Sequence, residues 1–441
     1  MTLDELREQV AQGAVDTVVL ALCDMQGRLQ GKRLTATHFL DDVAAHGAEA
    51  CNYLLAVDVD MNTVEGYAMS SWSRGYGDFV MKPDFDTLRP LPWAPGSVML
   101  LADLAWHDGG PVVASPRQIL RRQLEGLHQR GWEAHAGTEL EFIVFRDTYE
   151  EAFLKGYKSL VPANQYNVDY SLLGTARIEP LLRRIRNEMA AAGMRVEDAK
   201  GECNFGQHEI NFHFAPALQS ADDHAVYKEG AKEIAAQEGV AITYMAKYDE
   251  REGNSCHIHL SLREMDGGLV FEDESLFHSF VAGQLKYLRE LTLFYAPNVN
   301  SYKRYAQGSF APTAVRWGHD NRTCALRVVG HGPSLRVENR VPGADVNPYL
   351  AIAAMIAAGM RGVDERLELE APFEGNAYDD DGPKVPTTLR DARNLLAESA
   401  LAREAFGDEV VDHYLNYARV ELDAFDAAVT DWERVRGFER L

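Results

Sequence analysis

Positive charge is scarce in this sequence of 441 residues. Lys and Arg total 44 against 67 Asp and Glu, which gives a net charge of −23 at pH 7. A chain with this charge repels a phosphate backbone, so we expect no nucleic-acid partner. An anionic substrate must be bound by a local group of arginines or by metal ions, because the overall field opposes it.

Cysteine and long apolar runs are also scarce. The 5 cysteines form no CxxC pair, so neither a disulfide framework nor a zinc knuckle is indicated. The first residues lack the basic start and the apolar run of a signal peptide. The longest apolar stretch, Tyr349 to Met360, is shorter than the roughly 20 residues that span a bilayer. We therefore expect a cytoplasmic protein with no membrane segment.

The two common phosphate-binding loops are missing as well. The sequence contains neither G-x-x-x-x-G-K-[ST] nor G-x-G-x-x-G, so a P-loop or Rossmann nucleotide site is not expected. If a nucleotide binds, arginine side chains must contact its phosphates, and Arg322 and Arg327 are candidates.

The patterns that are present indicate a large two-domain enzyme. Short β-like runs and Pro-rich turns fill the N-terminal part, and a loop-like break at His107–Pro111 precedes a helix that begins at Ser115–Pro116. We predict a small domain at residues 1–110 and a larger α+β domain at residues 111–441. Helical patterns in the larger domain cover Thr175–Ala192, Ser220–Gln237, Glu274–Leu293, Pro348–Met360, Leu389–Leu401 and Asp408–Arg434.

Carboxylates recur at alternate positions of the predicted strands. Glu139 and Glu141 share one face of a strand that ends at Phe145. Glu202 precedes a second alternating strand, which begins near Glu209. A solvent-exposed strand face explains the first pair equally well. However, like charges this close repel one another unless cations lie between them, so a metal site is the competing interpretation.

Two further strands also present polar side chains on one face. One strand follows a Gly-rich turn and carries imidazoles, and the other carries an acid between two bases. Structural histidines and a surface ion-pair ladder are the alternatives. They do not explain why four separate strands present polar groups at a period of two. The residues are His257, His259 and Ser261 on the first strand and Arg336, Glu338 and Arg340 on the second.

The ligand types favour one class of metal. Carboxylates with a minority of imidazole suit Mg²⁺ or Mn²⁺ better than zinc, and these ions commonly bind beside substrate phosphates. We therefore predict a metal-dependent enzyme that uses ATP. The predicted ion cluster consists of Glu139, Glu141, Glu202, Glu209, His257 and Glu338.

Taken in order, these motifs resemble those of the glutamine synthetase family, over nearly the whole chain and most specifically from Glu139 to Leu350. The family's E-x-E strand, E…G-Q-x-E segment, G-x-x-x-H-x-H-x-S strand, N-x-Y-K-R loop, N-R-[ST] turn and R-x-E-x-R strand all have counterparts here. The resemblance implies an N-terminal β-grasp domain and a large catalytic domain. It also implies a homo-oligomer of two stacked hexameric rings, because the family builds each site between neighbouring subunits.

The resemblance implies a role for each site residue. Glu141, Glu202 and Glu209 would hold one metal ion, and Glu139, His257 and Glu338 a second, with roughly two to three Mg²⁺ or Mn²⁺ ions in all. The remaining implied roles are ATP binding by Glu197, His259, Ser261, Arg322, Arg327 and Arg336, glutamate binding by Gly253, Arg304 and Arg340, and catalysis by Arg322, Arg340 and Glu338.

The implied activity is a two-step ligation. The γ-carboxylate of glutamate attacks the γ-phosphate of ATP, and an amine then displaces phosphate from γ-glutamyl phosphate. The product is a γ-glutamyl amide.

Two departures from the family pattern bear on the amine. Where the ammonia enzymes have a glutamate after the N-x-Y-K-R loop, this chain has Phe310, and Val64 and Glu65 lie where their D-G-S-S loop is missing. A small ammonium ion needs close carboxylates to offset its desolvation, whereas an alkylamine can be held by apolar contact. We predict a polyamine, ethanolamine or another monoamine as acceptor. The alternatives are a glutamine synthetase that uses ammonium and a non-catalytic regulatory relative.

Overall fold

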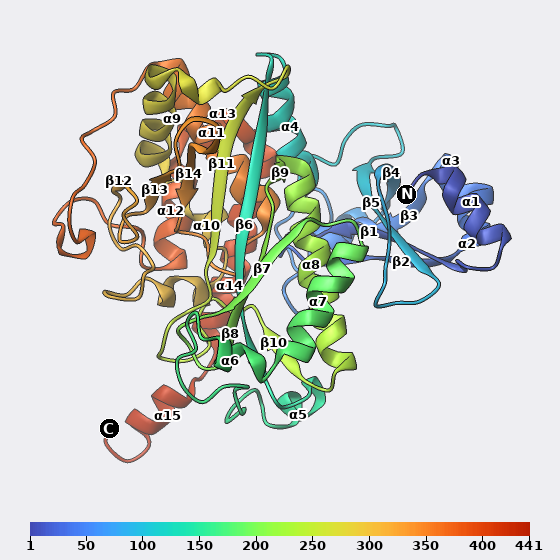
Figure 1. The fold of residues 1–441 in the computed structure, drawn as a ribbon, viewed down its shortest axis with the longest axis horizontal. Coiled ribbons are helices and arrows are strands. Elements are labelled where there is room, and N and C mark those ends of the chain that lie inside the picture. Colours follow the sequence, from blue (N-terminus) through green and yellow to red (C-terminus); the bar gives the residue numbers. More distant parts are fainter.

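Two β-sheets organise the chain, which the computed structural model describes over residues 1–441. The first sheet has five strands in the order β2-β1-β5-β4-β3, and the second has nine and is built around β6. Figure 1 shows the first sheet at the blue end of the chain, to the right of the long strands β6 and β11 of the second. The predicted α+β class is confirmed.

The first sheet has a parallel pair at its centre. β1 pairs with β5 in parallel and with β2 in antiparallel orientation, and a short helical segment at residues 36–46 connects β2 to β3. This arrangement is the one expected of a β-grasp unit. Its elements are α1 (Leu3–Ala11), β1 (Thr17–Cys23), β2 (Leu29–Thr35), α2 (Ala36–His38), α3 (Ala44–His46), β3 (Ala48–Cys51), β4 (Asp78–Pro90) and β5 (Ser97–Ala105).

The second sheet carries the candidate site. Its order is β12-β13-β14-β11-β6-β8-β7, and β9 and β10 also pair with β6. The strands are β6 (Trp132–Phe145), β7 (Val196–Gly201), β8 (Gln207–Phe212), β9 (Ala215–Pro216), β10 (Ala241–Thr243), β11 (Cys256–Glu264), β12 (Trp317–His319), β13 (Leu326–Val329) and β14 (Arg336–Asn339).

Helices cover one face of this sheet. The Phe212 ring of β8 lies 4.8 Å from the Tyr227 ring of α8, and His224 of α8 lies 3.1 Å from the Thr138 hydroxyl of β6. Because side chains alternate along a strand, Glu139, Glu141 and their neighbours at alternate positions point to the opposite face. The helices that follow β5 along the chain, not all of which lie on this face, are α4 (Pro116–His128), α5 (Tyr149–Leu154), α6 (Leu172–Ala176), α7 (Glu179–Ala191), α8 (Ala217–Gln237), α9 (Glu274–Tyr287), α10 (Thr292–Tyr295), α11 (Pro348–Glu365), α12 (Leu389–Glu398), α13 (Ala400–Phe406), α14 (Asp408–Ala427) and α15 (Asp431–Gly437).

Several predicted helices are interrupted. α7 begins only at Glu179, with a proline in its first turn, which is a favoured position for proline. Ser399 ends α12 and caps α13, because its hydroxyl accepts the Ala402 amide, and Thr430 caps α15 in the same way. The prediction of one continuous helix was therefore wrong for Thr175–Ala192, Glu274–Leu293, Leu389–Leu401 and Asp408–Arg434.

A buried arginine joins the first sheet to helices α4 and α8. Arg117 of α4 donates to Asp84 of β4 at 2.7 Å, to Asp103 of β5 at 2.6 Å and to both carboxylate oxygens of Asp222 of α8 at 2.8 and 2.9 Å. The side chains of Arg117 and Asp222 are each only 3% exposed. Separating the first sheet from these helices would leave buried charges without partners, which is costly.

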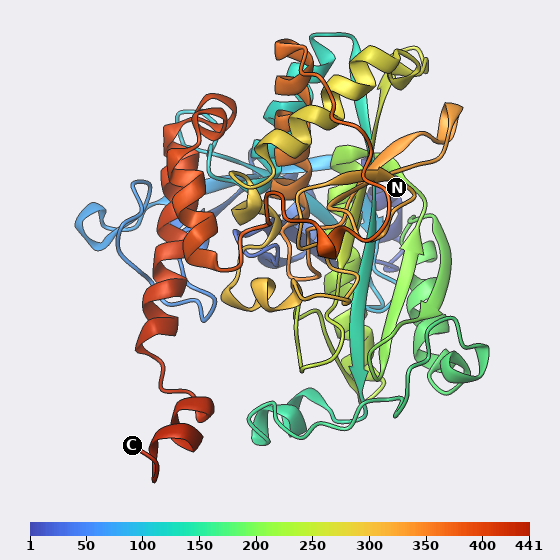
Figure 2. The same cartoon turned by 90° about the vertical axis from the view of Figure 1, so that its left-hand side faces the viewer.

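The C-terminal helix α15 extends away from the rest of the chain in both views (Figures 1 and 2). It exposes the large apolar side chains of Trp432 and Val435, and Phe438 directly after it is exposed as well. Its first residue, Asp431, pairs with Lys158. No helix of the structure has the length and apolar character that crossing a membrane requires.

Candidate active site

The polar face of the second sheet lines two adjoining cavities. The first has a volume of about 800 Å³ and the second about 630 Å³. Glu139, Asp198 and Asn211 line both, and they form one cross-strand row over β6, β8 and β7. The two cavities therefore meet at Glu139.

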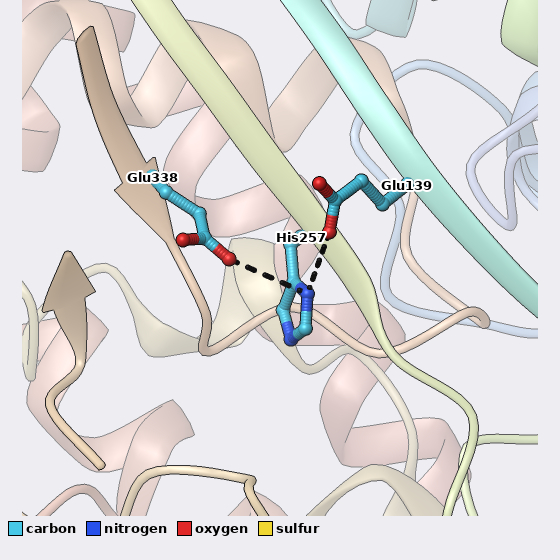
Figure 3. Close-up of side chains that lie close together, drawn as sticks. All are labelled: Glu139, His257 and Glu338. Carbon is cyan, nitrogen blue, oxygen red and sulfur yellow. Dashed lines mark hydrogen bonds and ion pairs between the residues drawn. The ribbon is translucent and has the colours of Figure 1, made fainter. Parts of the chain in front are cut away.

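Glu139, His257 and Glu338 come from three neighbouring strands and point toward one another (Figure 3). The Nδ1 atom of His257 lies 3.1 Å from a Glu139 oxygen and 3.5 Å from a Glu338 oxygen. One ligand atom of each residue lies within 4.8 Å of the others. The structure thus brings together the three residues predicted to form one metal centre.

Burial controls the charge of this first cluster. It lowers the pKa of His257 to about 4, so the imidazole is neutral at pH 7 and has a free lone pair. The other ring nitrogen, Nε2, is buried and has no hydrogen-bond partner. Burial opposes ionisation of Glu338, but the neighbouring imidazoles and the Arg340 guanidinium hold its pKa below the usual value. Arg327 and Arg340 both donate hydrogen bonds to its carboxylate.

Glu141, Glu202 and Glu209 form a second cluster in the first cavity. Glu141 lies directly opposite Glu209 in the β6–β8 pair, and ligand atoms of all three residues lie within 4.8 Å of one another. Burial raises the pKa of Glu141, and burial together with the nearby carboxylates raises the pKa of Glu209 to about 8. Three carboxylates in this setting need a cation before all of them ionise, so the donor set fits a divalent ion.

The residues predicted to bind ATP lie in both cavities. His259 connects the first cluster to the second cavity. Its Nε2 lies 2.9 Å from a Glu139 oxygen, and its Nδ1 accepts a hydrogen bond from Arg336 at 3.1 Å. Glu197 and Ser261 line the second cavity together with His259 and Arg336, whereas Arg322 and Arg327 line the first. A nucleotide that spans the junction would contact both groups.

Two of the three residues predicted to bind glutamate line the first cavity, and Arg304 does not. Gly253 and Arg340 are part of the wall. Arg304 is buried behind it and donates at 2.8 Å to the carbonyl oxygens of Val341 and Arg340. A Cβ atom at position 253 would clash with the carbonyl oxygen of Ala246 and lie 2.6 Å from Cγ of Arg304, so only glycine fits there. Arg304 therefore supports the wall in this structure.

The predicted amine-pocket residues are also divided. Phe310 lines the first cavity, is 54% exposed and has a φ of 56°, a strained value for a bulky residue. Val64 and Glu65 lie outside it, on a loop held against α14, where the Glu65 carbonyl accepts from Asn416 at 3.2 Å and Arg419 at 2.9 Å. Within one chain this loop does not reach the cavity.

The cavity wall also contains residues that the sequence patterns did not identify. Lys200 lies directly opposite Glu209 in the β7–β8 pair, so an alternating pattern that includes β7 was the available signal. Asp169 and Tyr170 line the cavity from an irregular segment before α6, which has no periodic pattern, and Leu172 lines it from the first position of α6. Asp169 also forms a third close group with Glu202 and Cys203.

Comparison with known proteins decides the family. Residues 113–436 match the family described as glutamine synthetase, catalytic domain. The chain belongs to the glutamine synthetase family. It is 67% identical over 443 residues to γ-glutamylethanolamide synthetase GlnA4 of Streptomyces coelicolor, an alignment that covers 100% of this chain and 96% of that protein. It is 34% identical over 444 residues to glutamate–isopropylamine ligase of a Pseudomonas species, with 98% and 97% coverage.

A solved structure of GmaS in complex with ADP has the same fold. It superposes with a TM-score of 0.86 at 25% identity, and the match covers 98% of this chain and 99% of that one. Glutamine synthetases use ATP and divalent metal ions, and the two carboxylate clusters described above are suitable ligands for such ions. The predicted family and fold are confirmed.

Proposed function

We propose that this glutamine synthetase relative joins the γ-carboxylate of L-glutamate to a small organic amine at the expense of ATP, with ethanolamine as the preferred amine. The observation that carries the choice of amine is Phe310 in the cavity wall, where the ammonia enzymes have an acid. The 67% identity to a γ-glutamylethanolamide synthetase supports ethanolamine over a polyamine.

The cavity residues supply the chemistry of the first step. The second cavity takes the nucleotide, with the phosphates directed toward Glu139 and Arg327. Arg340 and Gly253 border the site for glutamate, whose γ-carboxylate attacks the γ-phosphate and releases ADP. Arg322 lines the same cavity and offsets negative charge on the transferring group. Divalent ions held by the two clusters would supply charge neutralisation for the phosphates.

The second step forms the amide. The amine nitrogen attacks the acyl carbon of γ-glutamyl phosphate, and inorganic phosphate leaves with the electron pair of the broken carbon–oxygen bond. Asp169, which lies close to Glu202 in the cavity wall, is a carboxylate that can accept the proton lost by the amine. The phenyl ring of Phe310 covers apolar surface of the amine chain and helps to orient the nucleophile.

The test is glutamate-dependent phosphate release from ATP with a panel of amines. Ammonium, ethanolamine, isopropylamine, putrescine and spermine are compared at equal concentration in the presence of Mg²⁺ or of Mn²⁺, which also identifies the more effective ion. We expect the highest kcat/KM with ethanolamine. A kcat/KM for ammonium equal to that for ethanolamine would support the glutamine synthetase alternative, and no turnover with any amine would support the non-catalytic one.

We further propose that the enzyme is a cytoplasmic homo-oligomer, with domains at residues 1–110 and 111–441 in each subunit. The loop between β5 and α4 supports the division. The exposed apolar side chains of α15 and the position of Val64 and Glu65 outside their own chain's cavity support contacts between subunits. Two stacked hexameric rings are expected, and sedimentation analysis of the full chain tests this assembly.

A further inference from the structure

Lys200 lies within the second carboxylate cluster. It is directly opposite Glu209 in the β7–β8 pair, and Glu209 is directly opposite Glu141 in the β6–β8 pair. The three residues therefore form one row across three strands, and their side chains share a face of the sheet. The Lys200 ammonium contacts Glu202 and lies 3.4 Å from a Glu209 oxygen. Its position follows from the strand register as well as from the side-chain contacts.

The ammonium group changes the charge that this cluster presents to a metal ion. Glu141, Glu202 and Glu209 together carry three negative charges when all are ionised, and Lys200 reduces the net charge to about −2, which one divalent ion balances. A metal ion that enters the cluster meets the ammonium at the same oxygens, so the two cations compete.

In this same position the ammonium also lies beside an aromatic ring. Nζ of Lys200 lies 5.0 Å from the centre of the Tyr170 ring, within the range of a cation–π interaction. Tyr170 lines the same cavity. The ring and the carboxylates therefore contact the ammonium together and hold it at the mouth of the cluster.

We propose that Lys200 is a tethered counter-ion of the Glu141–Glu202–Glu209 cluster, which stabilises the cluster before metal binds and weakens its affinity for a divalent ion. This inference rests on the proposed function only in taking the cluster to be a metal site. Lys200 is a positioning residue, because it acts through the carboxylates. Its presence sets the concentration of free metal at which this centre fills.

Mn²⁺ binding to the full chain tests the proposal without glutamate, ATP or amine. Metal is removed with EDTA, and Mn²⁺ is then titrated by calorimetry, with free Mn²⁺ followed by electron paramagnetic resonance. Lys200→Met removes the charge and keeps the length of the side chain. We expect this variant to bind Mn²⁺ on the order of tenfold more tightly, because a close unit charge is lost. Lys200→Arg, which keeps the charge, should bind as the wild type does.

Two controls assign the effect to this cluster. Lys82 is an exposed lysine of β4, and Lys82→Met should leave Mn²⁺ affinity unchanged. Adding Glu209→Gln to Lys200→Met should remove the gain. Thermal melting monitors folding, and Mn²⁺ should raise the melting temperature more in Lys200→Met than in the wild type.

The proposal would be overturned if folded Lys200→Met bound Mn²⁺ no more tightly than the wild type. The same holds if Lys200→Gln bound Mn²⁺ no more tightly than the wild type. If Lys200→Met does not fold, Lys200→Gln provides the same comparison. Because no substrate is present, these results do not depend on which amine the enzyme uses, and an inactive enzyme with the expected Mn²⁺ affinities would contradict only the proposed function.

Discussion

Replacing Phe310 by glutamate should shift the enzyme from ethanolamine toward ammonium. The phenyl ring lines the cavity and is 54% exposed, so about half of its surface is available to a bound amine. Ethanolamine carries two methylene groups, and each contributes about 0.8 kcal/mol when fully buried. Full coverage by the ring is therefore worth about 1.6 kcal/mol, and half coverage about 0.8 kcal/mol.

The expected change is a ratio of specificities. Because about 1.36 kcal/mol corresponds to a factor of ten, loss of the ring should lower the ratio of kcat/KM for ethanolamine to that for ammonium by about 4-fold to 15-fold. A carboxylate at this position attracts both cations, so its Coulomb contribution largely cancels in the ratio. The lost apolar contact affects ethanolamine alone.

Phosphate release with each amine measures the two kcat/KM values. Phe310→Leu is the matched control, because it keeps apolar cover on the same left-handed backbone and should hold the ratio within about twofold. Melting curves establish that both variants fold. If folded Phe310→Glu keeps the wild-type ratio, then Phe310 does not contact the amine and the basis for choosing an organic amine is wrong.

Three further predictions concern charge and stability. Glu338→Gln should abolish turnover and lower the free energy of unfolding by about 3–5 kcal/mol, because Arg340 stays buried with its charge unpaired; urea unfolding measures this. Arg117→Met should destabilise the protein by a similar amount, about 3–5 kcal/mol, since Asp222 loses its partner, and an unchanged unfolding midpoint would contradict the role of this ion network. Burial lowers the pKa of His413 from 6.5 to about 4, so the folded state resists a proton that the unfolded state accepts. Stability should therefore fall as the pH drops from 6.5 to about 4, by about 3 kcal/mol for this group, and His413→Gln should show a shallower loss in pH-dependent urea unfolding.

The strands that carry the site could be predicted from the sequence because alternation is a local property. A period of two places Glu139, Glu141, His257 and Glu338 on the polar faces of their strands. The register of β6 with β11 and with β8 shows these faces on the same side of the sheet. Which strands are neighbours is not encoded locally, so the order of strands in the sheet was not predicted. The division of the carboxylates into two groups came from the resemblance, and the same two groups lie together in the structure.

Features that depend on tertiary contacts could not be predicted in this way. Arg304 lies in a motif whose arginine is expected to bind substrate. In the structure its terminal nitrogens instead donate hydrogen bonds to the carbonyl oxygens of Val341 and Arg340. Lys200 is unremarkable in the sequence until the register of β7 places it opposite Glu209. Helix interruptions at Ser399 and Thr430 follow from capping, which competes with helical periodicity over one or two residues.

β6 supplies one carboxylate to each cluster, and this has a consequence for how the two centres can change. Glu139 and Glu141 are alternate residues of a single extended strand, so their Cα atoms are held about 6.7 Å apart by the backbone repeat. No side-chain substitution elsewhere alters that spacing, and a shift of β6 would displace both centres in the same direction. The two centres therefore form a unit of constant length, and variation among amine substrates has to be accommodated by the loops around it.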